Sequence, residues 1–203
     1  METITRNYVV YDYSELSEEA KEKVKEWYID DDCRSDIFTE DIEYFLSENF
    51  SESELKVQYS LGYCQGDGLN IYGKLYLCDM LDKITFEGYT EKEKRFIVWL
   101  FTKWNTYFSV KIPANNHYCY CIADQLDIRY DLEYDLEYDH IRDINYEAIR
   151  KFEIDIIDYF EKLCSDYEEA GYKYFYDPDE EEIADTCEAN EWKFTEDGEF
   201  FAL

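Results

Sequence analysis

The sequence predicts an α+β fold in which amphipathic helices pack against an antiparallel sheet. Some segments place apolar residues at helical spacing, and others alternate strictly on either side of a short glycine turn. The apolar fraction of 46% includes 13 Phe, 4 Trp and 22 Tyr, which a disordered chain would lack. With 203 residues, 7 Gly and 2 Pro, no linker is evident, so residues 1–203 are predicted to form a single compact domain.

The N-terminal part predicts a strand followed by two helices. β-Branched and aromatic residues between Ile4 and Tyr13 favour the strand. Ser17 is a suitable N-cap for a helix to about Ile29, and the run 30–32 ends it. A second short helix is predicted to begin near Thr39 and to end in the polar stretch 47–53.

The middle of the chain contains the strongest local pattern, a β-hairpin. Apolar residues alternate with polar ones over 55–63 and again over 69–77, around Gly66-Asp67-Gly68. Thr90 and Glu93 then form a capping box ahead of an amphipathic helix to about residue 107.

The C-terminal half predicts paired strands, a long helix and two small elements. A Pro-Ala-Asn-Asn turn at 113–116 favours pairing of the segment around Ser109 with the segment from Tyr118 onward. Asn145 caps a long helix that Gly171 is expected to stop. The sequence also predicts a last helix with Asp177 as N-cap, Pro178 at the first position and Glu180 as capping-box acid, and then a small hairpin around Asp197-Gly198.

Charge restricts the functional classes. The chain has 50 acidic and 20 basic residues, a net charge of -30, which disfavours direct binding to nucleic acid or to an anionic membrane. No apolar run of 18 residues is present, and the start METITRNYVVYDY lacks the pattern of a signal peptide, so a cytoplasmic protein is expected. Seven cysteines without a framework pattern are expected to be reduced.

The most unusual segment is the tandem repeat 131–139. As a strand, it would place Leu and Tyr on one side and five carboxylates on the other, about 6.7 Å apart. A helix is the alternative conformation, although like charges four residues apart oppose it. A solvated edge strand, protected by its charges from pairing with another edge, explains the segment without any binding role.

A nucleic-acid mimic explains the charge differently. A net charge of roughly 2–8 is enough for solubility in a small domain, so -30 leaves a large excess. Three acidic clusters would complement a basic groove and accelerate encounter with it. The candidate partner-binding residues are Asp30, Asp31, Asp32, Asp131, Glu133, Asp135, Glu137, Asp139, Asp179 and Glu180.

Motifs for catalysis or for metal binding are weak. His117, Cys119 and Cys121 alternate on one face of a possible strand without an evident fourth zinc ligand. The glycine turn at 66–68 lacks the Lys-Ser/Thr of a P-loop, and the acidic run at 177–180 lacks EF-hand spacing. We therefore predict no catalytic residue, metal or cofactor, and no enzymatic activity.

Three signatures resemble a widespread, largely uncharacterised family of small phage and prophage proteins. They are ELSEEAK at 15–21, QGDG at 65–68 and ANEWKFTEDG at 189–198. The acidic segment 131–139 departs from the family's usual pattern. The resemblance supplies a phage setting and no catalytic residues.

A phage setting implies an anti-defence role for an acidic surface. The expectation is an anti-CRISPR-like inhibitor in the host cytoplasm, whose partner is a basic nucleic-acid-binding protein such as a CRISPR effector nuclease. An antitoxin-like or host-takeover adaptor that binds a protein through a shaped apolar surface is the alternative, and an enzyme is a distant third.

Overall fold

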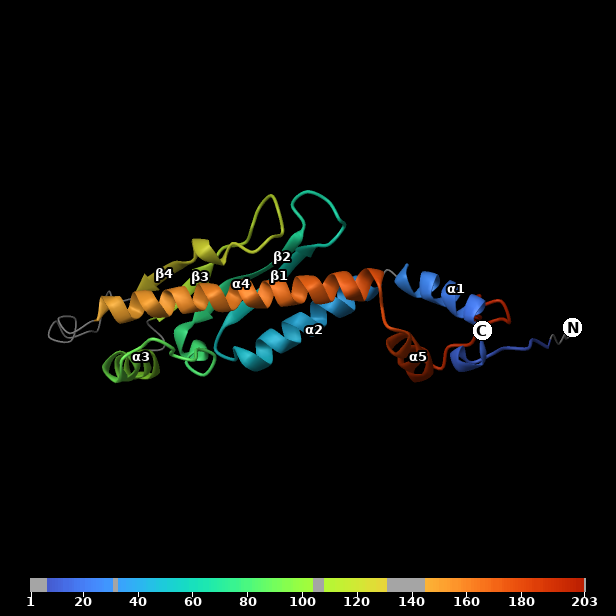
Figure 1. Cartoon of the computed structure of the whole chain (residues 1–203), viewed down its shortest axis with the longest axis horizontal. Coiled ribbons are helices and arrows are strands. Elements are labelled where there is room, and N and C mark those ends of the chain that lie inside the picture. The colour runs from blue at the N-terminus through green and yellow to red at the C-terminus, as the bar shows by residue number, and fades with distance from the viewer. Residues whose placement is uncertain (1–6, 31–32, 104–107, 131–144, 203) are drawn as a thin grey trace, which may run out of the picture. The chain divides into compact units, whose positions relative to one another are not determined.

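The structure, a computed structural model, describes residues 7–30, 33–103, 108–130 and 145–202 (Figure 1). It is an α+β fold with an antiparallel sheet and amphipathic helices, as the sequence predicts. In chain order its elements are η1 (Tyr13–Glu15), α1 (Glu18–Ile29), α2 (Cys33–Asn49), β1 (Glu54–Ser60), β2 (Gly68–Tyr76), η2 (Leu77–Met80), α3 (Glu91–Lys103), β3 (Phe108–Ile112), η4 (Ala123–Gln125), β4 (Asp127–Tyr130), α4 (Tyr146–Tyr176) and α5 (Glu180–Ala189).

The chain divides into two compact units. Unit 1 comprises Met1–Ile37 and Tyr172–Leu203, and unit 2 comprises Phe38–Gly171. Helices α2 and α4 contribute residues to both. Each unit is described by itself, and the single compact domain stays a prediction.

Unit 2 is built on the sheet, whose strand order is β1-β2-β3-β4 with antiparallel neighbours. The predicted hairpin is confirmed, with Val57 paired to Ile71 and Ser60 to Gly68. Because side chains alternate across a strand, one face collects apolar residues. The buried members of this face are Val57, Leu69, Ile71, Leu75, Val110 and Ile112.

Helices cover this apolar face. In α4, a stripe at helical spacing is buried, and the Cys164 thiol accepts a hydrogen bond from the backbone of Ile71. In α2, the Thr39 hydroxyl lies 3.2 Å from the Tyr59 hydroxyl. Figure 1 shows α4 running along the sheet. The core of unit 2 therefore lies between the sheet and these helices.

Among the residues that the structure describes, the segment after β3 covers one end of the second face of the sheet. Asn70 is fully buried there; its Nδ2 donates to the Pro113 carbonyl (3.1 Å) and its Oδ1 accepts from the Ile122 backbone (3.1 Å). The glycines of the hairpin turn permit this cover, because a Cβ on Gly68 would lie 2.6 Å from the Cα of Tyr120. The segment from 113 to 122 thus folds over half of this face.

This cover corrects the predicted pairing after the turn at 113–116. β3 does pair with an antiparallel strand, but that strand is β4, in which Asp127 opposes Lys111. The segment from Tyr118 does not pair with β3, because it is occupied by contacts to the hairpin, including the bond from the Cys119 backbone to the Gly66 carbonyl (3.0 Å).

Unit 1 packs α1 and α5 around a small aromatic core. Ser17 caps α1 as predicted, accepting from the Ala20 backbone at 3.2 Å. Trp27 stacks on Phe200 with ring centroids 4.6 Å apart, and the predicted terminal hairpin is confirmed as a bridge between Phe194 and Phe200. The buried residues of this core are Tyr13, Leu16, Ala20, Val24, Tyr28, Ile183, Cys187 and Phe194.

Two predictions near the N-terminus are wrong in part. Within the described part of the predicted strand Ile4–Tyr13, the only ladder contact is the isolated bridge from Tyr11 to Phe194, because the chain turns into the 3-10 helix η1 at Tyr13. Helix α2 begins at Cys33 rather than near Thr39, since the turn before Thr39 buries Arg34.

Two helix boundaries near the C-terminus also differ. Gly171 does not stop α4, which continues to Tyr176. A Cβ at Gly171 would lie 2.4 Å from Leu61 Cδ1, so the glycine serves close packing. The N-cap of α5 is Asp179 rather than Asp177, which places Pro178 before the helix.

Candidate acidic interface

Three of the ten predicted partner-binding residues lie within the described structure, and all three belong to unit 1. Asp30 is the exposed C-cap of α1, Asp179 is the N-cap of α5, and Glu180 opens that helix. The other predicted residues fall outside the described residues: Asp31, Asp32, Asp131, Glu133, Asp135, Glu137 and Asp139.

The predicted acids at the start of α5 are engaged in ion pairs. Asp179 Oδ2 lies 2.7 Å from Lys173 Nζ, and Glu180 Oε1 lies 2.7 Å from Lys21 Nζ. The hydrogen bond to Glu180, with a second one to Glu18, raises the pKa of Lys21. Acids in the first turn also favour the positive end of the helix dipole. Asp179 and Glu180 therefore hold α5 to its neighbours in unit 1, which reduces the charge that they offer to a partner.

Other acids of α1 are exposed and unpaired. They lie at positions separated by three or four residues, on the side of the helix away from buried Ala20 and Val24. Within the described part of the chain, their carboxylates make no hydrogen bond or ion pair. This α1 acidic face consists of Glu19, Glu22, Glu26 and the C-cap Asp30.

Helix α5 carries a second face of the same kind. Glu181, Asp185 and Glu188 follow at intervals of four and three residues, all exposed, opposite buried Ile183 and Cys187. No side-chain hydrogen bond or ion pair joins these three carboxylates to any residue that the structure describes. We call these three residues the α5 acidic face.

Such faces oppose folding. Like charges three or four residues apart are neighbours about 5–6 Å apart, and each pair costs a few tenths of a kcal/mol. The surrounding charge does not compensate, because unit 1 has 22 acidic and 7 basic residues among 69. Unit 2 carries the same net charge of -15 on 134 residues. Charge is therefore most concentrated in unit 1.

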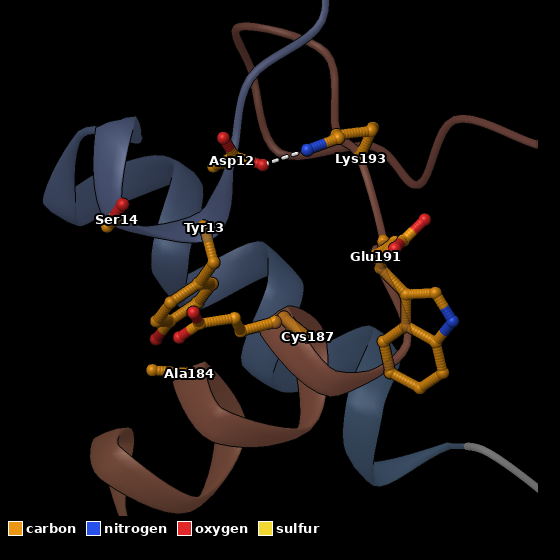
Figure 2. A pocket seen from close by; sticks show the side chains of 9 residues that line it. Asp12, Tyr13, Ser14, Ala184, Cys187, Glu191 and Lys193 are labelled. Carbon is orange, nitrogen blue, oxygen red and sulfur yellow. Dashed lines mark hydrogen bonds and ion pairs between the residues drawn. The ribbon is translucent and has the colours of Figure 1, made fainter.

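A pocket of about 710 Å³ lies in unit 1 beside the α5 acidic face (Figure 2). Figure 2 shows the ion pair of Asp12 and Lys193 at one end and Tyr13 with Ala184 toward the other. Its carboxylates outnumber its single lysine. The lining residues are Asp12, Tyr13, Ser14, Ala184, Cys187, Glu188, Glu191, Trp192 and Lys193.

Two buried titratable groups line this pocket, and both are neutral at physiological pH. Burial raises the pKa of Tyr13 to about 12, and the nearby Glu180 carboxylate adds to the shift. Burial also raises the pKa of the Cys187 thiol to about 11. Since a thiolate rather than a thiol is the nucleophile, this arrangement suits binding better than covalent chemistry.

The three residues considered from the sequence as zinc ligands, His117, Cys119 and Cys121, do not form a metal site in the described structure. Cys119 and Cys121 lie in the segment that covers the hairpin, and His117 donates its backbone N–H to the Asn115 side chain. Among the described residues, no group of three or more His, Cys, Asp or Glu side chains is arranged to hold a metal ion.

Comparison of the chain with protein-family models, with curated proteins and with solved structures finds no match. The resemblance to a phage family therefore stays a prediction. Within the residues that the structure describes, no helix combines the length and the apolar character needed to cross a membrane.

Proposed function

We propose that this protein is an acidic nucleic-acid mimic that occupies the basic groove of a nucleic-acid-binding protein. The phage setting implied by the three signatures directs the proposal to an anti-CRISPR-like inhibitor of a nucleic-acid-guided nuclease, acting in the host cytoplasm. The observation that carries the proposal is the pair of exposed, unpaired acidic faces on α1 and α5.

The spacing of these faces supports binding to a basic groove. Successive carboxylates about 5–6 Å apart form a line of charge on a rigid helix. A groove that holds a phosphate backbone is lined by Lys and Arg, which would meet this line with opposite charge. Long-range attraction would also accelerate encounter at low salt.

The pocket supplies a place for an anchoring residue of the partner. Glu188, Glu191 and Trp192 line it, while the Asp12 carboxylate is paired with Lys193. An arginine side chain suits this combination, because its guanidinium pairs with carboxylates and stacks on aromatic faces. A neutral Tyr13 and Cys187 line the wall against which its carbon chain would lie.

The proposal is tested by removing charge from each face. One variant carries Glu19→Gln, Glu22→Gln and Glu26→Gln, and the other carries Glu181→Gln, Asp185→Asn and Glu188→Gln. The matched control removes three charges from α4 of unit 2, where Asp158, Glu161 and Glu169 are exposed. Target cleavage by a panel of purified guided nucleases is measured with each protein, and affinity is measured from about 50 to 300 mM salt.

We expect the wild type to inhibit at least one effector, with affinity falling at least about tenfold over this salt range. Each face variant loses at least about tenfold in affinity, whereas the control changes it by less than about twofold. An affinity that does not change with salt and is the same in both face variants would favour the adaptor that binds through an apolar surface. Inhibition that depends on turnover would instead indicate an enzyme.

A further inference from the structure

Half of the second face of the sheet in unit 2 is left uncovered by the described segments, and lysines line it, in contrast to the acidic faces of unit 1. One half is closed by the segment from 113 to 122, which buries Asn70 and accepts a hydrogen bond from the Gln58 side chain (2.9 Å to the Asn115 carbonyl). The other half is a hollow of about 640 Å³. We call it the lysine hollow, and its lining residues are Glu54, Lys56, Tyr72, Gly73, Lys74, Ser109 and Lys111.

Three adjacent strands each contribute one lysine to this hollow. Lys56 comes from β1, Lys74 from β2 and Lys111 from β3, and Lys74 lies directly opposite Lys111 in the register. Like charges opposite one another destabilise an antiparallel pair. The lining residues hold three lysines and one glutamate, a charge of about +2 at neutral pH, and the register also places Asp127 of β4 opposite Lys111. A chain with a net charge of -30 thus places three lysines on adjacent strands, where acids opposite Lys74 and Lys111 offset part of the repulsion between them.

The side chains of the hollow are arranged to receive a ligand. Lys74 Nζ donates to the Tyr76 hydroxyl (2.6 Å) and lies 4.4 Å from the centre of that ring, which fixes its position. Lys56 and Lys111 are exposed and make no hydrogen bond or ion pair with the residues that the structure describes. The Tyr72 ring and the Ser109 hydroxyl likewise have no ring partner and no hydrogen-bond partner, respectively, in the described ranges.

We propose that the lysine hollow binds a nucleotide carrying two or three phosphates. The ammonium groups of Lys56 and Lys111, with Lys74 between them, would pair with the phosphates, and the Ser109 hydroxyl would donate to a phosphate oxygen. The Tyr72 ring provides a surface on which a base stacks. The volume falls in the range of about 300–1,000 Å³ usual for small-molecule sites.

The overall charge favours a small ligand over a nucleic-acid strand. The Debye length is about 8 Å at physiological salt, so a nucleotide held among three lysines is shielded from distant carboxylates. A strand that continued beyond the hollow would meet the negative surface of a chain with charge -30. This inference does not depend on the proposed function, because it uses a different face and a different unit.

The test is calorimetric titration of the full-length protein with ATP, ADP, pyrophosphate, adenosine and a 12-nucleotide single strand. We expect ATP and ADP to bind, pyrophosphate to bind more weakly, and adenosine not to bind. The double variant Lys56→Gln, Lys111→Gln should lose at least about tenfold in ATP affinity. Tyr72→Leu should weaken ATP several-fold and leave pyrophosphate unchanged, which a general loss of structure would not do.

The matched control removes two exposed positive charges elsewhere in unit 2, with Lys92→Gln and Arg95→Gln on α3. It should change ATP affinity by less than about twofold, and circular dichroism should show that every variant is folded. The proposal is overturned if neither ATP nor ADP binds, if the control loses as much affinity as the hollow variant, or if the single strand binds more tightly than ATP.

Discussion

At the scale of residues, Arg34 is a buried cation in unit 1. It is 3% exposed, and its guanidinium carbon lies 4.1 Å from the Tyr28 ring centre and 3.9 Å from that of Tyr174. One Nη donates to the Tyr174 carbonyl, and Glu182 lies 3.7 Å away. Residues of α1, α2, α4 and α5 thus meet at one side chain. Its Nε and Nη1 have no hydrogen-bond partner among the described residues, so ring stacking and charge must offset their burial.

Arg34→Lys is therefore expected to destabilise the protein by about 2–4 kcal/mol, because a lysine keeps the charge but cannot stack as a plane between two rings. Urea unfolding followed by far-UV circular dichroism measures the change. Arg95→Lys, at an exposed position of α3, is the control and should change stability by less than about 0.5 kcal/mol. Equal stability of Arg34→Lys and wild type would show that stacking of the guanidinium between the Tyr28 and Tyr174 rings contributes nothing specific.

At the scale of elements, the start of α3 is held by hydrogen bonds within its own first turn and by an ion pair with α4. The Glu93 carboxylate accepts from the Thr90 backbone (2.7 Å), and the Thr90 hydroxyl accepts from the Glu93 backbone (3.2 Å), which confirms the predicted capping box. The same carboxylate binds Lys151 of α4 at 2.7 Å. These bonds lower the pKa of Glu93 to about 2, the bond to Lys151 being the largest cause.

The lowered pKa predicts how this contact depends on pH. A carboxyl whose pKa is lower in the folded state stabilises the fold above its unfolded pKa, which is about 4.5. That contribution is lost as the pH falls from about 5 to about 2. The wild type should therefore be more stable than Glu93→Gln at pH 7, and the difference should shrink steadily below about pH 5.

Urea unfolding of both proteins at pH 7, 5, 3.5 and 2.5 measures this difference directly, since the other carboxylates are common to both. Glu91→Gln, an exposed change in the same turn, should differ from the wild type by less than about 0.5 kcal/mol at pH 7. A difference between wild type and Glu93→Gln that stays constant down to pH 2.5 would argue against the ion pair with Lys151 as its source.

Elements specified by neighbouring residues were predictable from the sequence. The cap at Ser17 and the capping box at Thr90 depend on contacts three residues apart, and the hairpin around Gly66 pairs residues 8 to 20 apart. Gly171 was not predictable in this way, because its reason for being a glycine is Leu61, more than a hundred residues earlier. A helix-ending glycine and a glycine that admits a neighbouring side chain look the same in sequence.

At the scale of the whole molecule, the sequence indicated an acidic protein but located the candidate interface only in part. Local density of acids singled out Asp179 and Glu180, which the fold pairs with Lys173 and Lys21. The exposed faces instead follow helical spacing, as in Glu181, Asp185 and Glu188. That periodicity was present in the sequence, but only the fold shows which acids remain unpaired.

The uneven charge predicts an uneven response to salt. Unit 1 carries a net charge of -15 on 69 residues, against -15 on 134 in unit 2, so repulsion per residue is greater in unit 1. Raising NaCl from about 10 to 150 mM shortens the Debye length from about 30 to 8 Å and weakens that repulsion. It also weakens ion pairs such as Lys25 with Asp177, but exposed pairs contribute only about 0–1 kcal/mol each. Because acids are in excess, added salt should therefore stabilise unit 1 on balance.

Amide hydrogen exchange resolves this prediction by segment. Protection in 7–30, 33–37 and 172–202 should rise with salt by more than protection in 38–171, because relief of repulsion is greatest where charge is densest. The triple variant Glu19→Gln, Glu22→Gln, Glu26→Gln supplies the control, since three fewer charges should reduce the salt response of unit 1 and leave that of unit 2 unchanged. If protection in unit 1 instead falls as salt is added, its ion pairs outweigh the repulsion, and the acidic faces are less costly to the fold than their spacing implies.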